Sequence, residues 1–108
     1  MKVSVYGCGS IGQRHLKNLD KIRDELGISE LACFDQNISR AESLTNSISQ
    51  LKICKNIEEA SIDCDVAFVC VPTSLHVQII NEILLNSEYN YYIPSWNLGQ
   101  IIVDYVKL

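Results

Sequence analysis

Three glycines near the start of the chain have a spacing that is typical of phosphate binding. Gly7, Gly9 and Gly12 form a G-x-G-x-x-G pattern, which follows a short strand-like segment and opens a helical one. In that context the first glycine permits a tight turn, the second lets a pyrophosphate approach the backbone, and the third lets the helix pack on the strand. The start of the helix adds free N–H groups and partial positive charge. The pattern predicts a diphosphate site; the alternative is an ordinary turn with coincidental glycines.

An acidic residue follows where a dinucleotide site needs one. Asp35 ends a second apolar segment, 23 positions after Gly12, and the acid that bonds a ribose hydroxyl is expected about 20 residues beyond the glycines. A carboxylate there repels a 2′-phosphate, so the sequence favours NAD over NADP. Two alternatives stay open. Asp35 could instead be the N-cap of the next helix or a turn residue. Arg40 is interpreted as a surface residue of that helix, and the alternative is that it reaches a 2′-phosphate.

A second candidate segment follows the most apolar stretch of the chain, at residues 71–76. Ligands of open α/β sheets bind at the carboxyl ends of the strands, so Pro72 and Thr73 are expected to contact the nicotinamide ribose side. Alternatively, Thr73 or Ser74 caps the helix that follows. His76 either donates to cofactor or substrate, or covers the first turn of that helix.

The elements that position these residues are predicted from apolar periodicity. Strand-like and helical segments alternate along the chain, which indicates an α/β fold: a Rossmann-like doubly wound parallel sheet of about five strands with flanking helices. Residues 1–93 are expected to form this domain, and residues 94–108 a tail with an amphipathic helix over 98–106. Strands are predicted over 3–6, 31–34, 51–54, 66–71 and 91–93, and helices over 11–26, 38–48, 56–62 and 74–85.

Composition excludes several classes of function. The net charge of −4 argues against a surface that tracks nucleic acid, and the longest apolar run is too short for a membrane span. The five cysteines are odd in number and include no C-x-x-C pair, so neither a disulfide framework nor a metal site is expected. Cys8, inside the glycine pattern, is interpreted as a small neutral spacer rather than a reactive thiol. The N-terminus has no signal-peptide layout, which predicts a cytoplasmic location.

Taken together, three segments carry a family resemblance. Residues 5–15, Asp35 with 40–42, and residues 69–76 resemble the N-terminal domain of the Gfo/Idh/MocA oxidoreductases, two-domain NAD(P)-dependent dehydrogenases that act mostly on sugars, sugar acids, inositols and nucleotide sugars. The resemblance covers about residues 2–93. It implies that Asp35 holds the adenosine ribose. It further implies a pyrophosphate site formed by Gly7, Gly9, Ser10, Ile11 and Gly12, and a nicotinamide side lined by Pro72, Thr73 and His76.

The chain also departs from this family. The family's Glu-Lys-Pro motif after the fifth strand is replaced here by Tyr91–Ile93 followed by Pro94, and no lysine lies between Lys55 and Lys107. The large C-terminal domain that carries the acid/base residues is missing, so no catalytic residue is assigned and a truncated chain is expected. The first hypothesis is therefore an NAD-binding domain that is not competent alone. The alternatives are an oxidoreductase completed by a separate chain and a non-catalytic module that dimerises through residues 97–107.

Overall fold

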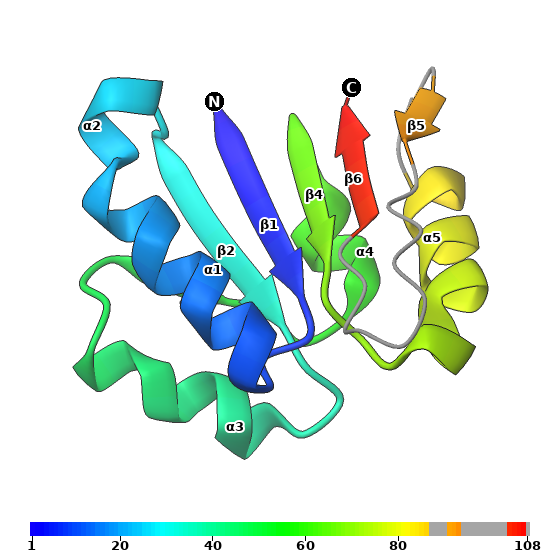
Figure 1. Ribbon diagram of the computed structural model, residues 1–108, viewed down its shortest axis with the longest axis horizontal. Coiled ribbons are helices and arrows are strands. Elements are labelled where there is room, and N and C mark those ends of the chain that lie inside the picture. Colours follow the sequence, from blue (N-terminus) through cyan, green and yellow to red (C-terminus); the bar gives the residue numbers. More distant parts are fainter. Residues whose placement is uncertain (87–90, 94–103, 108) are drawn as a thin grey trace.

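The computed structural model describes residues 1–86, 91–93 and 104–107. Its strands form one sheet in the order β3-β2-β1-β4-β6-β5, of which β1 to β4 are mutually parallel, while β6 runs antiparallel to both of its neighbours. Figure 1 shows β1, β2 and β4 ending at a common lower edge. The strands are β1 (Lys2–Tyr6), β2 (Glu30–Phe34), β3 (Leu51–Ile53), β4 (Val66–Val69), β5 (Tyr91–Ile93) and β6 (Asp104–Lys107).

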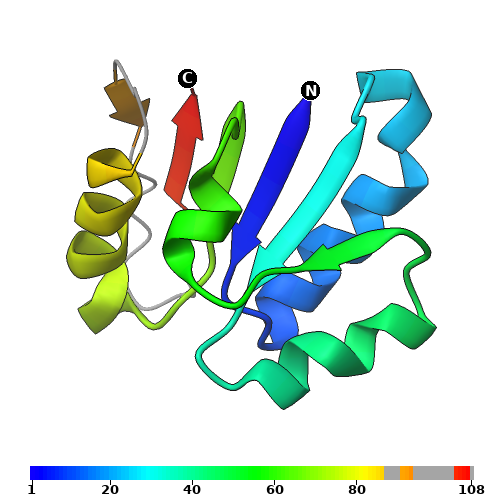
Figure 2. The ribbon, with the colours of Figure 1, turned by 180° about the vertical axis from the view of Figure 1, so that it is seen from behind.

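Helices cover both faces of the sheet, as the alternating pattern predicts. One face carries α1, α2 and α3, and the opposite face carries α4 and α5, which Figure 2 shows from behind. The two layers confirm the predicted α/β fold class. The helices are α1 (Ser10–Lys21), α2 (Arg23–Leu26), α3 (Ile38–Glu42), α4 (Ile57–Ser61) and α5 (His76–Leu85), with short 3₁₀ helices η1 (Ser43–Asn46) and η2 (Thr73–Leu75).

Each face of the sheet has its own buried cluster, because side chains alternate along a strand. On the α1 side, Val3 and Val5 of β1 pack with Leu16 and Leu19 of α1. On the other side, Ala67 and Val69 of β4 belong to a cluster with the apolar stripe of α5, Ile79, Ile80 and Ile83. The central strands are thus covered on both faces, as a near-continuous apolar run predicts for parallel strands.

Side-chain hydrogen bonds join β1 to the end of α4. Lys2, Ser4 and Tyr6 alternate along β1 and are all buried. The Lys2 ammonium donates to the carbonyl of Ile62 at 2.7 Å and the Ser4 hydroxyl to that of Ala60 at 2.6 Å. The Tyr6 hydroxyl lies 2.8 Å from that of Ser61. The first two bonds satisfy carbonyls at the end of α4, and all three connect this short helix to β1.

Two expectations about the elements need correction. The helix predicted over 98–106 is wrong for its last part, because Asp104–Lys107 form β6; the rest of it lies outside the described residues. The helical period of the sequence predicts a helix here, but pairing with β4 satisfies the backbone groups of an otherwise open edge. The helix predicted over 11–26 is divided at Ile22, although Gly27 ends it in the expected left-handed conformation.

Candidate functional site

The turn between β1 and α1 is fixed by close backbone packing. Gly7 has a φ of +103°, and its N–H donates to the carbonyl of Phe34 at 2.8 Å. A Cβ at Gly7 would lie 2.5 Å from the carbonyl oxygen of Cys70, and a Cβ at Gly12 would lie 1.7 Å from that of Gly7. Both positions therefore exclude any side chain, and the turn can form only with glycine at each.

Gly9 differs from the other two glycines. A Cβ built there would meet nothing within 4 Å, and its φ of −74° is one that any residue adopts. Packing within the domain does not require a glycine here. The open space lies beside a cavity that Gly9 itself lines, which is what close approach of a ligand to the backbone needs.

The start of α1 faces the same cavity. Gly9 is the N-cap, no side chain caps the helix, and no acidic residue lies in its first turn. The first backbone bond of the helix runs from the Gln13 N–H to the Gly9 carbonyl at 2.9 Å. The N–H groups of Ser10, Ile11 and Gly12 consequently precede the helical ladder. Such a terminus binds an anion well.

Asp35 lies where the sequence predicts, directly after β2, and its carboxylate is only 10% exposed. One oxygen, Oδ2, accepts the Cys8 N–H at 2.7 Å, and Oδ1 accepts the Asn37 N–H at 2.8 Å. The bond to Asn37, the N-cap of α3, confirms the turn-forming alternative for Asp35. Because Asp35 also lines the cavity, turn formation and contact with a ligand are compatible.

Arg40 belongs to the site although the sequence indicates a surface residue. Its side chain is half-exposed and lines the cavity, and Nη1 lies 3.8 Å from Oδ2 of Asp35. Arg40 follows Asp35 by five residues and lies in α3, which starts at Ile38. This short separation in the sequence is the feature that could have indicated the contact. The site thus pairs one buried carboxylate with one half-exposed guanidinium.

The turn after β4 forms the other wall. Val71, Pro72, Thr73 and Leu75 line the cavity, and the N–H of Cys70 donates to the Tyr6 carbonyl at 2.7 Å, which ties this turn to the first. Neither η2 nor α5 has a side-chain cap, so the capping alternative for Thr73 or Ser74 is wrong. The chain forms a 3₁₀ turn there, closed by the Leu75 N–H on the Pro72 carbonyl.

His76 is buried behind this wall. Its Nε2 lies 2.8 Å from the carbonyl oxygen of Val71, and it is not one of the cavity-lining residues. Of the two interpretations that the sequence leaves open, this geometry favours the structural one. His76 connects α5 to the segment that carries Val71 and Pro72.

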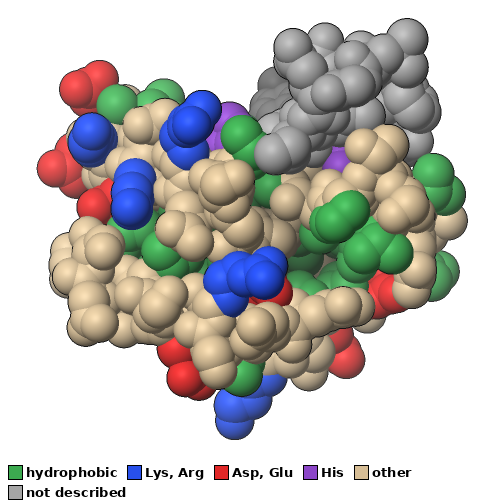
Figure 3. All heavy atoms as spheres, turned by 60° about the horizontal axis from the view of Figure 1, so that its bottom comes forward, with side chains coloured by type: hydrophobic (Ala, Val, Ile, Leu, Met, Phe, Trp, Pro, Cys, Tyr) green, Lys and Arg blue, Asp and Glu red, His purple; other side chains and the backbone are tan. Residues whose placement is uncertain are grey.

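The cavity has a volume of about 500 Å³ and opens at the carboxyl edge of the sheet. Figure 3 looks onto this edge: Lys and Arg side chains gather over the α1 side, whereas hydrophobic side chains are concentrated on the α5 side. Seven predicted site residues line the cavity, and Gly12 and His76 lie behind it. The seven are Gly7, Gly9, Ser10, Ile11, Asp35, Pro72 and Thr73; the sequence does not predict Tyr6, Phe34, Gln36, Cys70, Val71, Leu75 and Ile79.

The five cysteines are free and buried. A hydrogen bond with the Cys33 thiol, and next burial, raises the pKa of Cys8, and burial raises the pKa of Cys70 to about 12. This supports the interpretation of Cys8 as a spacer, because the thiolate is the reactive form.

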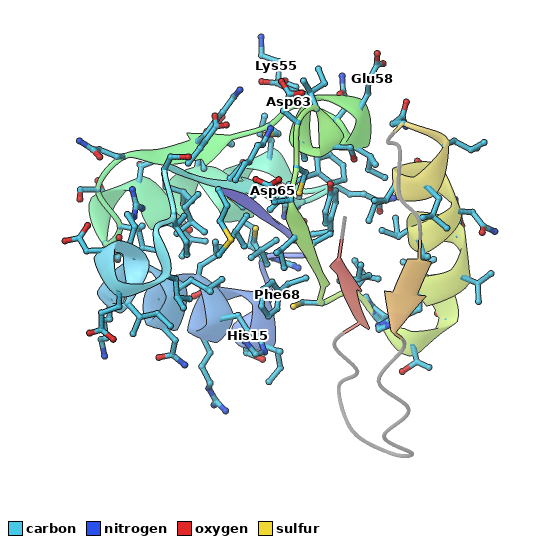
Figure 4. All side chains as sticks on the ribbon, turned by 90° about the horizontal axis from the view of Figure 1, so that it is seen from above. His15, Lys55, Glu58, Asp63, Asp65 and Phe68 are labelled. Carbon is cyan, nitrogen blue, oxygen red and sulfur yellow. The ribbon has the colours of Figure 1, made fainter. Side chains whose placement is uncertain are left out.

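One aromatic contact lies beside the first turn. Figure 4 shows His15 of α1 next to Phe68 of β4, with ring centroids 5.5 Å apart. Burial, and secondarily the charge of Arg14, lowers the pKa of His15. The His15 ring therefore packs as a neutral group. Within the described residues no group of His, Cys, Asp and Glu side chains fits a metal ion, and no helix is long and apolar enough to cross a bilayer.

A glycine turn at a helix start, a carboxylate at the end of the next strand and a cavity between two turns define a dinucleotide-binding Rossmann domain. Over residues 1–89 the chain matches the family described as "Oxidoreductase family, NAD-binding Rossmann fold". It is 31% identical over 85 residues to the myo-inositol dehydrogenase Hyg17 of Streptomyces leeuwenhoekii, an alignment that covers 78% of this chain and 25% of that protein. The chain therefore belongs to the Gfo/Idh/MocA oxidoreductase family, as its NAD-binding domain, which confirms the resemblance.

Solved structures agree on the fold. Two structures of a reductive aminase from Aspergillus terreus share 15% identity with this chain and cover 80% of it. The complex with NADPH and ethyl-5-oxohexanoate has a TM-score of 0.58, and the complex with NADPH4, cyclohexanone and allyl amine a TM-score of 0.59. The chain spans about a quarter of each of these relatives: 25% of the dehydrogenase, and 26% and 27% of the aminase chains.

Proposed function

We propose that the chain binds NAD in preference to NADP, with the diphosphate at the start of α1, the adenosine ribose at Asp35, and the nicotinamide half beside Pro72 and Thr73. The carrying observation is the open space at Gly9, which the fold does not use and which lies beside the cavity that Gly9 lines. The N–H groups of Ser10, Ile11 and Gly12 supply the donors that a diphosphate requires. In this proposal His76 acts on the site through the Val71 carbonyl rather than by touching the cofactor.

The preference for NAD rests on the charge at the end of β2. Asp35 is nine-tenths buried and oriented by two backbone N–H groups, so a 2′-phosphate would have to approach a fixed negative charge. Arg40 is the opposing feature, because its half-exposed guanidinium lies close enough to turn toward such a phosphate. The reductive aminase structures contain NADPH or NADPH4, which makes this choice the one to measure.

Calorimetric titration with NADH and NADPH tests the preference. We expect the wild type to bind NADH more tightly than NADPH. Asp35→Asn should lose most of that difference, because its affinity for NADH falls about tenfold while its affinity for NADPH is retained. Asp63→Asn is the matched control, since Asp63 is exposed on the loop before β4, away from the cavity. Tighter NADPH binding by the wild type would reverse the assignment.

For the complete enzyme we propose a dehydrogenase of cyclic polyols or other carbohydrates, in the cytoplasm, with this chain as the cofactor-binding part. Its support is the relative named a myo-inositol dehydrogenase. Within the described residues the α5-side wall, Val71 to Thr73 with Leu75, offers no lysine or histidine to take a hydroxyl proton. We therefore expect no NADH formation from myo-inositol or sugars by this chain alone, measured by NADH absorbance. Turnover by the isolated chain would contradict this.

A second candidate function is a dimerising module. Val77 and Leu85 on α5 are 66% and 84% exposed, and exposed apolar side chains on one helix favour association. Residues 97–103, part of the segment predicted to dimerise, lie outside the described residues. Light scattering over a concentration series separates a dimer from a monomer, and Leu85→Glu should dissociate a dimer formed through α5.

A further inference from the structure

The peptide group between Cys8 and Gly9 is held by a side chain that does not line the cavity. The Gln13 side-chain amide, Nε2, donates to the Cys8 carbonyl oxygen at 3.1 Å. The Gln13 backbone N–H donates to the next carbonyl, that of Gly9, at 2.9 Å. A single residue in α1 thus binds two successive carbonyl oxygens of the glycine turn, while Asp35 accepts the Cys8 N–H.

The geometry of a peptide bond gives this contact a consequence for ligand binding. The described residues include no cis peptide bond, and in a trans peptide the C=O and the following N–H point in opposite directions. A carbonyl that is turned toward Gln13 therefore directs the Gly9 N–H to the opposite side of that peptide. Gly9 lines the cavity whereas Gln13 does not, so the carbonyl oxygen that would repel an anion is turned away from it.

We propose that Gln13 is a positioning residue of the dinucleotide site: its side-chain amide holds the Cys8–Gly9 peptide so that the Gly9 N–H points at the diphosphate. The inference rests on the proposed function, because it assumes a diphosphate in the cavity. Gln13 is half-buried in the first turns of α1. The fold itself has other anchors for this turn, namely the Gly7 N–H on Phe34 and the Cys8 N–H on Asp35.

Substitutions of similar size separate this role from a contribution to stability. Gln13→Met keeps the length of the side chain and removes its donor. Gln13→Glu also removes the donor, but an acid near a helix N-terminus stabilises the helix, so this variant is expected to fold even if the methionine variant does not. Gln78→Glu is the control, since Gln78 is exposed on α5 and undergoes the same change of charge.

The measurement compares a ligand that has phosphates with one that has none. We expect Gln13→Met to weaken NADH about tenfold, the effect of losing roughly one hydrogen bond, and Gln13→Glu to weaken it further. Adenosine binding, followed by NMR, should change less than about twofold in both variants, and Gln78→Glu should match the wild type for both ligands.

Each outcome is decisive. If wild-type protein fails to bind NADH, the proposed function fails and the role of Gln13 falls with it. If the wild type binds NADH and both Gln13 variants bind it equally well, only the positioning role is overturned. Equal weakening of NADH binding and adenosine binding in a variant would also overturn it. The cause would then be a general distortion of the site rather than a Gly9 N–H that no longer points at the diphosphate.

Discussion

The two turns that form the cavity start from neighbouring parallel strands and have opposite chemistry. The turn after β1 is rich in glycine and presents backbone N–H groups at a helix start. The turn after β4 presents Val71, Leu75 and Pro72, which has no N–H to offer, and it enters α5 through a 3₁₀ turn. One wall therefore presents backbone N–H groups and the other mainly apolar side chains, which is the division that the proposed placement of a dinucleotide requires.

The three glycines of the first turn do not all serve the same purpose. In the first turn Gly7 and Gly12 are required by the protein's own packing, since a Cβ at either would meet a carbonyl oxygen, whereas Gly9 has open space. Gly9 is thus the position at which a requirement of the ligand can be distinguished from a requirement of the fold.

Gly12→Ala should have the largest effect. The added methyl group would lie 1.7 Å from the Gly7 carbonyl oxygen, so α1 must move away from the turn, at a cost of about 3 kcal/mol or more in the free energy of unfolding. NADH binding should be lost as well. Urea denaturation measures the first effect and fluorescence titration the second; unchanged stability would mean that the turn does not pack as described.

Gly9→Ala should leave the fold intact and remove the function. Its backbone angles suit alanine and its surroundings are open, so the thermal midpoint should stay within about 2 °C of the wild type. NADH affinity should fall at least about tenfold, because the methyl group occupies the space of the diphosphate. Normal NADH affinity in a stable Gly9→Ala protein would show that the ligand does not approach this backbone.

His76→Leu tests the second turn and should have a moderate effect. Loss of the bond to the Val71 carbonyl leaves a polar group without this partner, which should lower the free energy of unfolding by about 1–2 kcal/mol. NADH affinity should fall less than in Gly9→Ala, because the first turn is untouched. A larger loss of affinity than of stability would instead place His76 in contact with the cofactor.

The smallest effect concerns the thiols and appears only at high pH. Burial raises the pKa of Cys54 to about 11 and that of Cys70 to about 12, whereas a thiol in the unfolded chain titrates near about 8.5. Since the unfolded chain releases these protons first, the contribution of the two thiols to stability should be constant below about pH 8 and fall as pH rises toward those raised values. Cys70→Ala should reduce the pH-dependent part of this loss in urea denaturation; an identical pH dependence would contradict the assignment.

The sequence predicts the parts of this molecule whose causes are local. The order of parallel strands and helices follows from the apolar periodicity within each segment. Gly27, in the left-handed conformation, is a further example. Such features need no knowledge of what lies across the sheet.

The remainder depends on partners distant in the sequence. Lys2 and Ser4 are buried because α4, about 55 residues later, supplies carbonyl acceptors; nothing near them in the sequence indicates this. Residues 104–107 form a strand because β4 offers an open edge, whereas the helical period alone predicts a helix. Similarly, the contact of Arg40 with the site depends on the angle at which α3 leaves β2.

The most direct test follows the backbone N–H groups themselves by NMR on ¹⁵N-labelled protein titrated with ADP and, separately, with adenosine. If the start of α1 holds the diphosphate, the amide signals of Gly9, Ser10, Ile11 and Gly12 should shift with ADP more than any others and shift little with adenosine. Equal shifts with both ligands, or ADP-induced shifts that leave these four amides unchanged, would contradict a diphosphate site in this turn.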